Sequence, residues 1–321
     1  MKIALVGATG VVGEQILEQL IERSFPVGEL HLFASAESDG EFVDFAGESL
    51  LISTLGEDSF AGIDLVIFAT PSEVSQEWCP AAAAAGVISI DLSAASRLND
   101  SGSLLVAGVN SDKFAGTMVS TPASLTVQLS LLLNVLRRVA ELQSVLVTSV
   151  APASVRGRKG LDELQKQTGE LLNGRPVVSQ VFSSQLAFNC LPTADTAQEQ
   201  TLVDELCRVL DHQGLNVQIN RLQLPVFYGE GGFVRIEFSS AVSTEQVKAA
   251  LTAAEDFELQ DQSDFPELID AVGEELLLVR LCASPAEPSR VFDLWYAADN
   301  VGRCAAGNAV RLAEIVAARL S

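Results

Sequence analysis

The first third of the chain alternates short apolar runs with longer segments of helical periodicity. The apolar runs predict strands over 2–6, 29–34, 64–69, 87–91 and 117–120, and the periodic segments predict helices over 11–23 and 73–85. Residues 37–48 indicate a loop or an edge hairpin after the second strand. Because strands that alternate with helices form parallel sheets with right-handed crossovers, we expect an α/β fold of the Rossmann type.

After Pro122 the pattern changes to longer helices and clustered strands. Helices are predicted over 124–139, 157–172, 197–212, 243–254 and 304–319, and strands over 144–150, 216–220, 222–228, 232–238, 277–283 and 291–297. The last helix carries an apolar stripe, so we expect it to pack against the first domain. The sequence therefore predicts a nucleotide-binding domain over 1–123 with the C-terminal helix 301–321, and a second, α+β domain over 124–300.

Three glycines follow the first strand, at Gly7, Gly10 and Gly13, before the first helix begins. Glycines at such a turn let the backbone approach a pyrophosphate, and the free amides and dipole of the helix N-terminus favour negative charge. The spacing differs from the commoner Gly-x-Gly-x-x-Gly, and a glycine turn that binds nothing is the alternative. The pattern favours a dinucleotide site formed by Gly7, Ala8, Thr9, Gly10, Val11 and Gly13.

The composition is that of a globular protein, with 48% hydrophobic and 19% charged residues. With 20 basic and 42 acidic residues the net charge is −22, which gives no electrostatic reason to bind nucleic acid or an anionic membrane. We expect neither a membrane-spanning segment nor a signal peptide, and we expect a cytoplasmic protein.

Cysteine and histidine are scarce. The five cysteines lack Cys-x-x-Cys spacing, so we expect neither a disulfide framework nor a metal site. The two histidines, His31 and His212, restrict acid–base chemistry at neutral pH. Cys190 and Cys304 are expected in apolar surroundings, where a cysteine is an inert hydrophobe.

Motifs along the whole chain resemble the aspartate-semialdehyde dehydrogenase family. They include residues 6–13, Ile90-Asp91-Leu92-Ser93 with Arg97, residues 160–164, 186–189 and 224–229, and the segment from Leu294 to Ala306. The resemblance implies a Rossmann nucleotide-binding domain plus an α+β catalytic and dimerisation domain of the semialdehyde dehydrogenase type. It also implies a homodimer and a place in amino-acid biosynthesis.

Active members of this family reduce an aspartyl phosphate to the semialdehyde with NADPH, through a cysteine thiolate and a histidine. The resemblance aligns Ser124 with that cysteine, and Glu230 with that histidine. A serine hydroxyl is a poor substitute for a thiolate without an adjacent base, and Glu230, on an expected turn between strands, is expected to be solvated and ionised. We interpret Ser124 and Glu230 as degenerate, inactive catalytic positions, as in the Usg-type branch of this family.

The substrate-binding positions have changed as well. Gln223 aligns with the family's carboxylate-binding arginine, Ala151 with a glutamine, and Thr201 loosely with a lysine. Arg97 is retained where the family binds the substrate phosphate, although an arginine that only caps a surface loop is an equal alternative. The losses of the nucleophile, the base and the carboxylate-binding arginine act together on the reaction rate, so dehydrogenase chemistry is expected to be absent.

The resemblance extends the cofactor site to Ser35, Glu37 and Asn300. Glu37 replaces an arginine that faces the 2′-phosphate of NADP in relatives, and a carboxylate suits a free ribose hydroxyl, so NAD is favoured over NADP. Pro71 and Glu73 replace glycine-rich sequence near the phosphates, which weakens the site, and binding of no nucleotide is the alternative.

The leading hypothesis is a catalytically degenerate homologue that keeps NAD binding and acts as a binding, regulatory or subunit-partner protein. The first alternative is an active NAD(P)-dependent oxidoreductase that acts on an aldehyde or oxo group of an amino-acid-related substrate, in which Ser124 or Glu230 takes part. The second is a structural partner without nucleotide. A heterodimer with an active paralogue is a further hypothesis.

Overall fold

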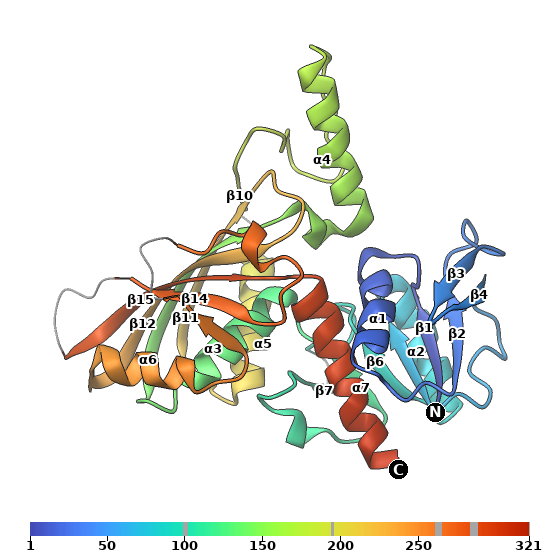
Figure 1. Cartoon of the computed structure of the whole chain (residues 1–321), viewed down its shortest axis with the longest axis horizontal. Helices are drawn as coiled ribbons and strands as arrows, with labels where there is room; N and C mark the ends of the chain where they lie inside the picture. Colours follow the sequence, from blue (N-terminus) through green and yellow to red (C-terminus); the bar gives the residue numbers. More distant parts are fainter. Residues whose placement is uncertain (99–101, 194–195, 261–264, 283–287, 321) are drawn as a thin grey trace. The chain divides into compact units, whose positions relative to one another are not determined.

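The computed structural model describes residues 1–98, 102–193, 196–260, 265–282 and 288–320. The chain divides into two compact units: unit 1 comprises Met1–Val127 with Ala305–Ser321, and unit 2 comprises Gln128–Cys304. Helix α3 (Ser124–Leu136) runs from the first unit into the second, so the units divide within this helix and not at its start. Figure 1 traces the chain through both units.

Unit 1 is built on a mostly parallel sheet. Among the described residues eight strands form it, in the order β3-β4-β2-β1-β5-β6-β8-β7. The strands are β1 (Lys2–Val6), β2 (Glu29–Phe33), β3 (Phe42–Phe45), β4 (Glu48–Ser53), β5 (Leu65–Phe68), β6 (Ile88–Asp91), β7 (Ser103–Leu104) and β8 (Met118–Ser120). Strands β3 and β4 pair antiparallel as an edge hairpin. Of the two possibilities predicted for residues 37–48, a loop or an edge hairpin, the hairpin is confirmed.

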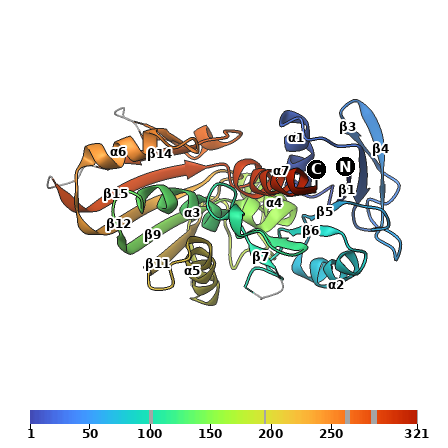
Figure 2. The ribbon, with the colours of Figure 1, turned by 90° about the horizontal axis from the view of Figure 1, so that it is seen from below.

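Helices cover both faces of this sheet, with α1 and α2 on opposite sides in Figure 2. The helices are α1 (Val11–Glu22), α2 (Ser72–Ala84) and α7 (Gly307–Leu320). Apolar side chains of α1 and α7, among them Ile16, Leu20 and Val310, share one core with Ile3 of β1. Burial of such side chains removes apolar surface from water, at about 25 cal/mol per Å². The expected packing of the C-terminal helix on the first domain is therefore present.

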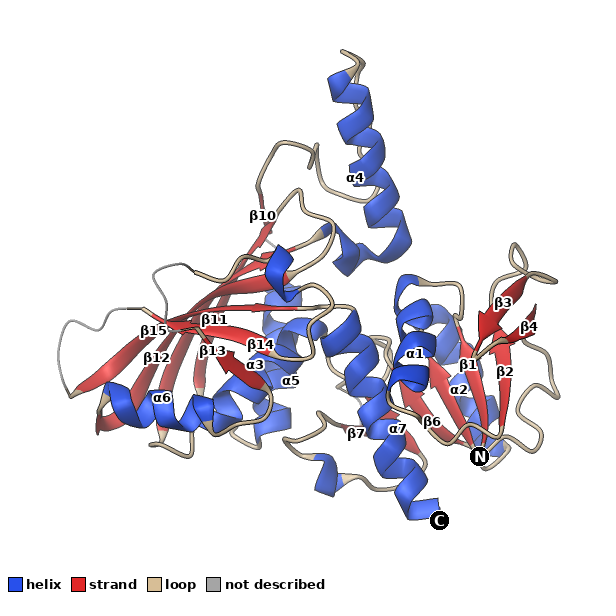
Figure 3. Cartoon of the chain, viewed as in Figure 1, coloured by secondary structure: helices blue, strands red, loops and turns tan. Residues whose placement is uncertain are grey.

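Unit 2 contains a second, mixed sheet. Among its described residues seven strands pair in the order β10-β11-β9-β12-β15-β14-β13. The strands are β9 (Leu142–Ala151), β10 (Leu191–Thr193), β11 (Asn216–Gln223), β12 (Glu230–Val242), β13 (Phe257–Leu259), β14 (Leu277–Leu281) and β15 (Ser289–Ala298). The helices of this unit beyond α3 are α4 (Gly157–Leu172), α5 (Thr196–Leu210) and α6 (Thr244–Thr252). Figure 3 shows α4 standing away from the sheet.

The prediction of two separate strands over 216–220 and 222–228 is wrong. A single strand, β11, ends at Gln223, and a turn leads from Leu224 to Gly229. Pro225 has no amide hydrogen for a ladder, and Gly229 has a φ of +86°, which ends the extended run. The turn brings the chain to Glu230, the first residue of β12.

Gly13 supports a prediction about stability. A Cβ added at Gly13 would lie 2.0 Å from the Gly7 carbonyl oxygen, so Gly13→Ala forces apart the turn and α1. We expect a loss of about 2 kcal/mol or more in the free energy of unfolding, measured by urea titration. Gly56→Ala is the matched control, because nothing lies within 4 Å of its added Cβ. Equal stabilities of the two variants would contradict the close approach.

Candidate functional site

The glycine turn of unit 1 is fixed by hydrogen bonds to its own backbone and to β2. The amides of Gly7 and Ala8 donate to the Phe33 carbonyl at 2.8 and 3.1 Å, and the Gly10 amide donates to the Gly7 carbonyl at 3.0 Å. Helix α1 begins at Val11, directly after Gly10, which provides no side-chain cap. The amides of the first helical turn lack intrahelical acceptors, and they form the kind of surface that binds a phosphate.

Two of these glycines are required by close contacts. Gly7 has a φ of +89°, and a Cβ there would lie 2.3 Å from the Ala69 carbonyl oxygen, after β5. The added Cβ of Gly13 would meet Gly7 itself. Ala8 is buried, and Thr9 lies in the turn between it and Gly10. The structure thus brings together all six residues predicted at this turn, between the end of β1 and the start of α1.

The predicted ribose-binding residues lie after β2. Ser35 and Glu37 are both exposed, in a turn that the Ser38 amide closes onto the Ser35 carbonyl at 3.0 Å. Asp39 has a structural contact, because its carboxylate accepts from the Thr54 amide at 3.0 Å and ties the hairpin segment to the chain after β4. Glu37 is therefore an exposed carboxylate that follows the carboxyl end of β2, and the glycine turn follows the carboxyl end of the parallel strand β1.

Pro71 and Glu73, the two residues expected to weaken nucleotide binding, lie at the start of α2. Pro71 precedes the helix and provides no side-chain cap, and Glu73 lies in the first helical turn. Both are exposed. A carboxylate in this position opposes a phosphate, whereas Glu73 is compatible with the dipole of its own helix.

A buried aspartate, Asp91 at the end of β6, holds the loops beyond the parallel strands. Its carboxylate accepts from the hydroxyls of Ser75, Ser93 and Ser96 at 2.9, 2.9 and 2.6 Å, and from the Ser93 amide at 2.9 Å. Four donors stabilise a carboxylate that has no exposed surface. From the sequence Asp91 was recognised only as part of a motif, and this role was missed; the serines that follow Asp91 were the available signal.

Arg97 and Ser124 belong to this same end of unit 1. The Arg97 guanidinium donates from Nε to the Thr121 carbonyl at 3.0 Å and from one terminal nitrogen to the Leu92 carbonyl at 2.7 Å. These bonds fix the chain just before Ser124, the half-buried first residue of α3. Arg97 thus has at least the loop-fixing role, and its binding of a substrate phosphate stays a prediction.

Glu230 is buried, which corrects the expectation of a solvated turn residue. Its exposed fraction is 0%, because β12 begins at Glu230 and lies between β9 and β15. One carboxylate oxygen accepts from Gln128 Nε2 at 2.9 Å, and the other lies 3.3 Å from a terminal nitrogen of Arg221. Arg221, which lies on β11 two residues before the predicted Gln223, was not predicted from the sequence.

Further polar groups surround Glu230 in unit 2. Burial raises the pKa of Tyr296 well above its usual value, and the nearby Glu230 carboxylate raises it further. Burial also raises the pKa of the Cys304 thiol, with Arg303 opposing and Glu230 adding to the shift. Cys304 therefore lies beside polar groups and not in apolar surroundings, and its raised pKa disfavours a thiolate nucleophile. Cys190, expected in apolar surroundings too, is instead exposed.

The other two predicted residues of unit 2 are buried and engaged. Gln223 donates from Nε2 to the Ala151 carbonyl at 2.8 Å, which links β11 to β9. Asn300 donates to Ser154 Oγ at 3.0 Å and accepts from the Gly229 amide at 3.2 Å. The Gln223 amide thus joins two strands and the Asn300 amide holds a turn of unit 2, and the ligand contacts of both residues stay predictions.

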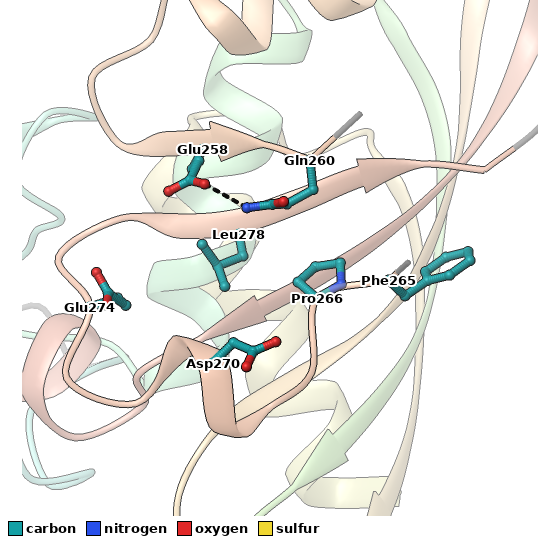
Figure 4. A pocket seen from close by; sticks show the side chains of 7 residues that line it. All are labelled: Glu258, Gln260, Phe265, Pro266, Asp270, Glu274 and Leu278. Atoms are coloured by element: carbon teal, nitrogen blue, oxygen red, sulfur yellow. Dashed lines mark hydrogen bonds between the residues drawn. The ribbon is translucent and has the colours of Figure 1, made fainter. Parts of the chain in front are cut away.

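Figure 4 shows a separate hollow of unit 2, near β13 and β14. It is lined by Glu258, Gln260, Phe265, Pro266, Asp270, Glu274 and Leu278. Two of its carboxylates have local partners, since Glu258 accepts from Gln260 and Asp270 from the Glu267 amide. The described residues contain no group of three or more potential metal ligands. Nor do the helices in the described part of the chain include one long and apolar enough to cross a membrane.

The fold and the glycine turn are those of a two-domain α/β protein with a Rossmann-type domain. Residues 2–117 match the family model for the semialdehyde dehydrogenase NAD-binding domain, and residues 133–303 match the model for its dimerisation domain. The chain therefore belongs to the semialdehyde dehydrogenase family.

Relatives of this chain carry two kinds of name. It is 40% identical to a USG-1 protein homolog of Azotobacter vinelandii, over 98% of this chain and 97% of the relative. It is 34% identical to aspartate-semialdehyde dehydrogenase 2 of Vibrio cholerae, over 98% and 97% of the two chains. The crystal structure of aspartate semialdehyde dehydrogenase II from Vibrio cholerae, complexed with ASA, is similar with a TM-score of 0.94 at 33% identity, covering 99% of this chain and 98% of the other.

The burial of Glu230 leads to a second stability prediction. In Glu230→Ala the Arg221 charge loses its partner, and we expect a loss of about 3–5 kcal/mol in the free energy of unfolding, measured by urea titration. Glu237→Ala is the control on the same strand, because Glu237 is partly exposed and its pairing with Arg290 at 3.7 Å is a surface contact. A loss in Glu230→Ala no larger than in this control would argue against a stabilised buried carboxylate.

Proposed function

We propose that this chain is a catalytically degenerate homologue of aspartate-semialdehyde dehydrogenase. In this proposal unit 1 binds a dinucleotide at the glycine turn, and the protein acts as a binding, regulatory or subunit-partner protein. The observation that carries the proposal is the contrast between the two units. The glycine turn has the geometry of an anion site, whereas Ser124 and Glu230 stand where the family has its thiol and imidazole.

The state of Glu230 supports the absence of catalysis. A general base needs to reach the proton that it removes, and the Glu230 carboxylate is engaged by Gln128 and Arg221. Ser124 is a hydroxyl at a helix start, and a serine needs an adjacent base to act as a nucleophile. Gln223, at the position of the substrate-binding arginine, is neutral and donates to the Ala151 backbone carbonyl.

The exposed position of Glu37 supports NAD over NADP as the dinucleotide. A carboxylate beyond the end of the second strand of a Rossmann domain accepts from a ribose hydroxyl and repels a 2′-phosphate. The exposed Asp39 and Glu41 add negative charge on the same segment.

We extend the proposal to a homodimer through unit 2, whose match to a dimerisation domain supports it. One face of the seven-stranded sheet carries exposed large apolar side chains, including Leu146, Phe233 and Val291. Phe233 packs against Trp295 with ring centroids 4.9 Å apart, so the apolar contact on this face joins β12 to β15. A heterodimer with an active paralogue remains the alternative, and co-purification from cells that express both chains tests it.

Nucleotide preference is tested by calorimetric titration with NAD and NADP separately. We expect NAD to bind at least about tenfold more tightly, which corresponds to about 1.4 kcal/mol. Glu37→Arg is expected to reduce or reverse this ratio, because it replaces the repelling carboxylate with a phosphate-binding guanidinium. Glu57→Arg makes the same change in net charge at another exposed position of unit 1 and should leave the ratio unchanged. Binding of neither nucleotide would refute the proposed site.

Loss of catalysis is tested by intact-protein mass spectrometry. After incubation with aspartate semialdehyde and NAD, we expect no covalent acyl adduct on the wild-type chain, because Ser124 lacks an activating base. The Ser124→Ala variant is the control and should likewise show no increase in mass after the incubation. An adduct on the wild type that disappears in Ser124→Ala would instead support the alternative of an active oxidoreductase.

A further inference from the structure

Helix α4 and the irregular segment after it, residues 173–190, line a hollow that differs from the one in Figure 4. The volume of this α4 hollow is about 340 Å³, at the lower end of the range for sites that hold small molecules. It is lined by Lys166, Gln167, Glu170, Arg175, Pro176, Val177 and Val178. All of these residues belong to unit 2, so the hollow is formed within one unit.

Two buried polar side chains of α4 fix the segment that forms one wall of this hollow. The Glu163 carboxylate accepts from the amides of residues 180–182 at 2.9, 2.6 and 3.3 Å. Gln167 Oε1 accepts from the amides of residues 186–187 at 2.7 and 3.1 Å, and Gln167 Nε2 donates to Ser179 Oγ at 3.1 Å. Because these bonds hold the segment against the helix without a ligand, little further ordering is needed on binding.

The charged groups of the α4 hollow are two cations and one carboxylate. Arg175 Nη1 lies 3.7 Å from Glu170 Oε2, a distance longer than a hydrogen bond, and side-chain exposure is 66% for Arg175. So exposed an ion pair stabilises the fold little, and a ligand can replace it. Lys166 is exposed and forms no ion pair or hydrogen bond within the part of the chain that the structure describes. Both signs of charge are therefore available to a ligand.

Apolar side chains complete the lining. Pro176, Val177 and Val178 follow Arg175 directly, and Val178 is 68% exposed although the neighbouring segment is fixed by hydrogen bonds. An apolar group placed against these side chains would remove their surface, and its own, from water. The α4 hollow thus combines a free cation, a loosely paired carboxylate and an apolar wall.

We propose that the α4 hollow binds an apolar α-amino acid, with its carboxylate on Lys166, its ammonium on Glu170 and its side chain against Val178. Lys166 and Glu170 are four residues apart on α4 and therefore face the same side, with Cβ atoms about 5–6 Å apart. This spacing suits the adjacent carboxylate and ammonium of an amino acid. A plain carboxylate would lie beside Glu170 uncompensated, and a plain amine would leave Lys166 without a partner. The inference uses neither the glycine turn nor Ser124, so it does not depend on the proposed function.

The test is calorimetric titration of the full chain with L-leucine and with two analogues that each lack one charge. 4-Methylpentanoate lacks the ammonium group, and 3-methylbutylamine lacks the carboxylate. We expect L-leucine to bind about threefold to fivefold more tightly than either analogue, because each analogue loses one partly exposed charge pair. No binding of L-leucine, or equal affinity for the three compounds, would overturn the inference.

Two single variants assign the charges to their partners. Lys166→Met should weaken L-leucine binding about threefold to fivefold without weakening 3-methylbutylamine, which has no carboxylate to lose a partner. Glu170→Gln should weaken L-leucine binding by a similar factor without weakening 4-methylpentanoate, which has no ammonium group. Circular dichroism verifies the fold of each variant. Unchanged L-leucine affinity in both variants would overturn the inference.

Lys159→Met and Asp162→Asn are the matched controls, because both positions are exposed on α4 and neither lines the hollow. They make the same changes in charge and should leave the affinity for L-leucine as in the wild type. L-Alanine tests the apolar wall, and we expect it to bind at least about fivefold more weakly than L-leucine, because its side chain covers less apolar surface. Losses in the controls as large as those in Lys166→Met and Glu170→Gln, or equal affinities for L-alanine and L-leucine, would contradict the assigned contacts.

Discussion

Glu230 has no exposed surface, and a carboxylate in that position must be stabilised by neighbouring donors if unit 2 is to fold. Gln128 reaches it from α3, which is distant from β12 in the sequence, and Arg221 reaches it from β11, the preceding strand. Burial and this carboxylate also raise the pKa of Tyr296, which keeps its hydroxyl protonated. The polar chemistry of the unit is therefore arranged around one buried negative charge.

Unit 1 depends on a different constraint, the close approach of backbone at Gly7 and Gly13. The approach places the start of α1 beside the ends of β1 and β5, while Asp91 ties the following loops together through three serines. Neither feature involves the positions that the family uses for covalent chemistry. A chain can lose the thiol and the imidazole and still keep this turn, because the glycines are also needed for packing.

Much of this was predictable from sequence, and the failures have specific causes. The apolar runs of unit 1 and the glycine turn were recognised because both patterns are local. Glu230 was misplaced because Gly229 and Gly231 around it suggest a loop. Gly231 and Gly232 instead lie inside β12, where an added Cβ would meet backbone oxygens of the neighbouring strands at 2.4 Å. Arg221 was missed because β9 inserts between β11 and β12, a pairing that no local pattern reveals.

In the proposed function, dinucleotide binding and dehydrogenase chemistry have become separated in this chain. The most direct measurement is absorbance at 340 nm in a single-turnover experiment, with the protein in excess over NAD and with aspartate semialdehyde and phosphate added. We predict no formation of NADH in a sample whose calorimetric titration shows bound NAD. Formation of NADH in proportion to the NAD supplied would contradict the claim and identify an active dehydrogenase.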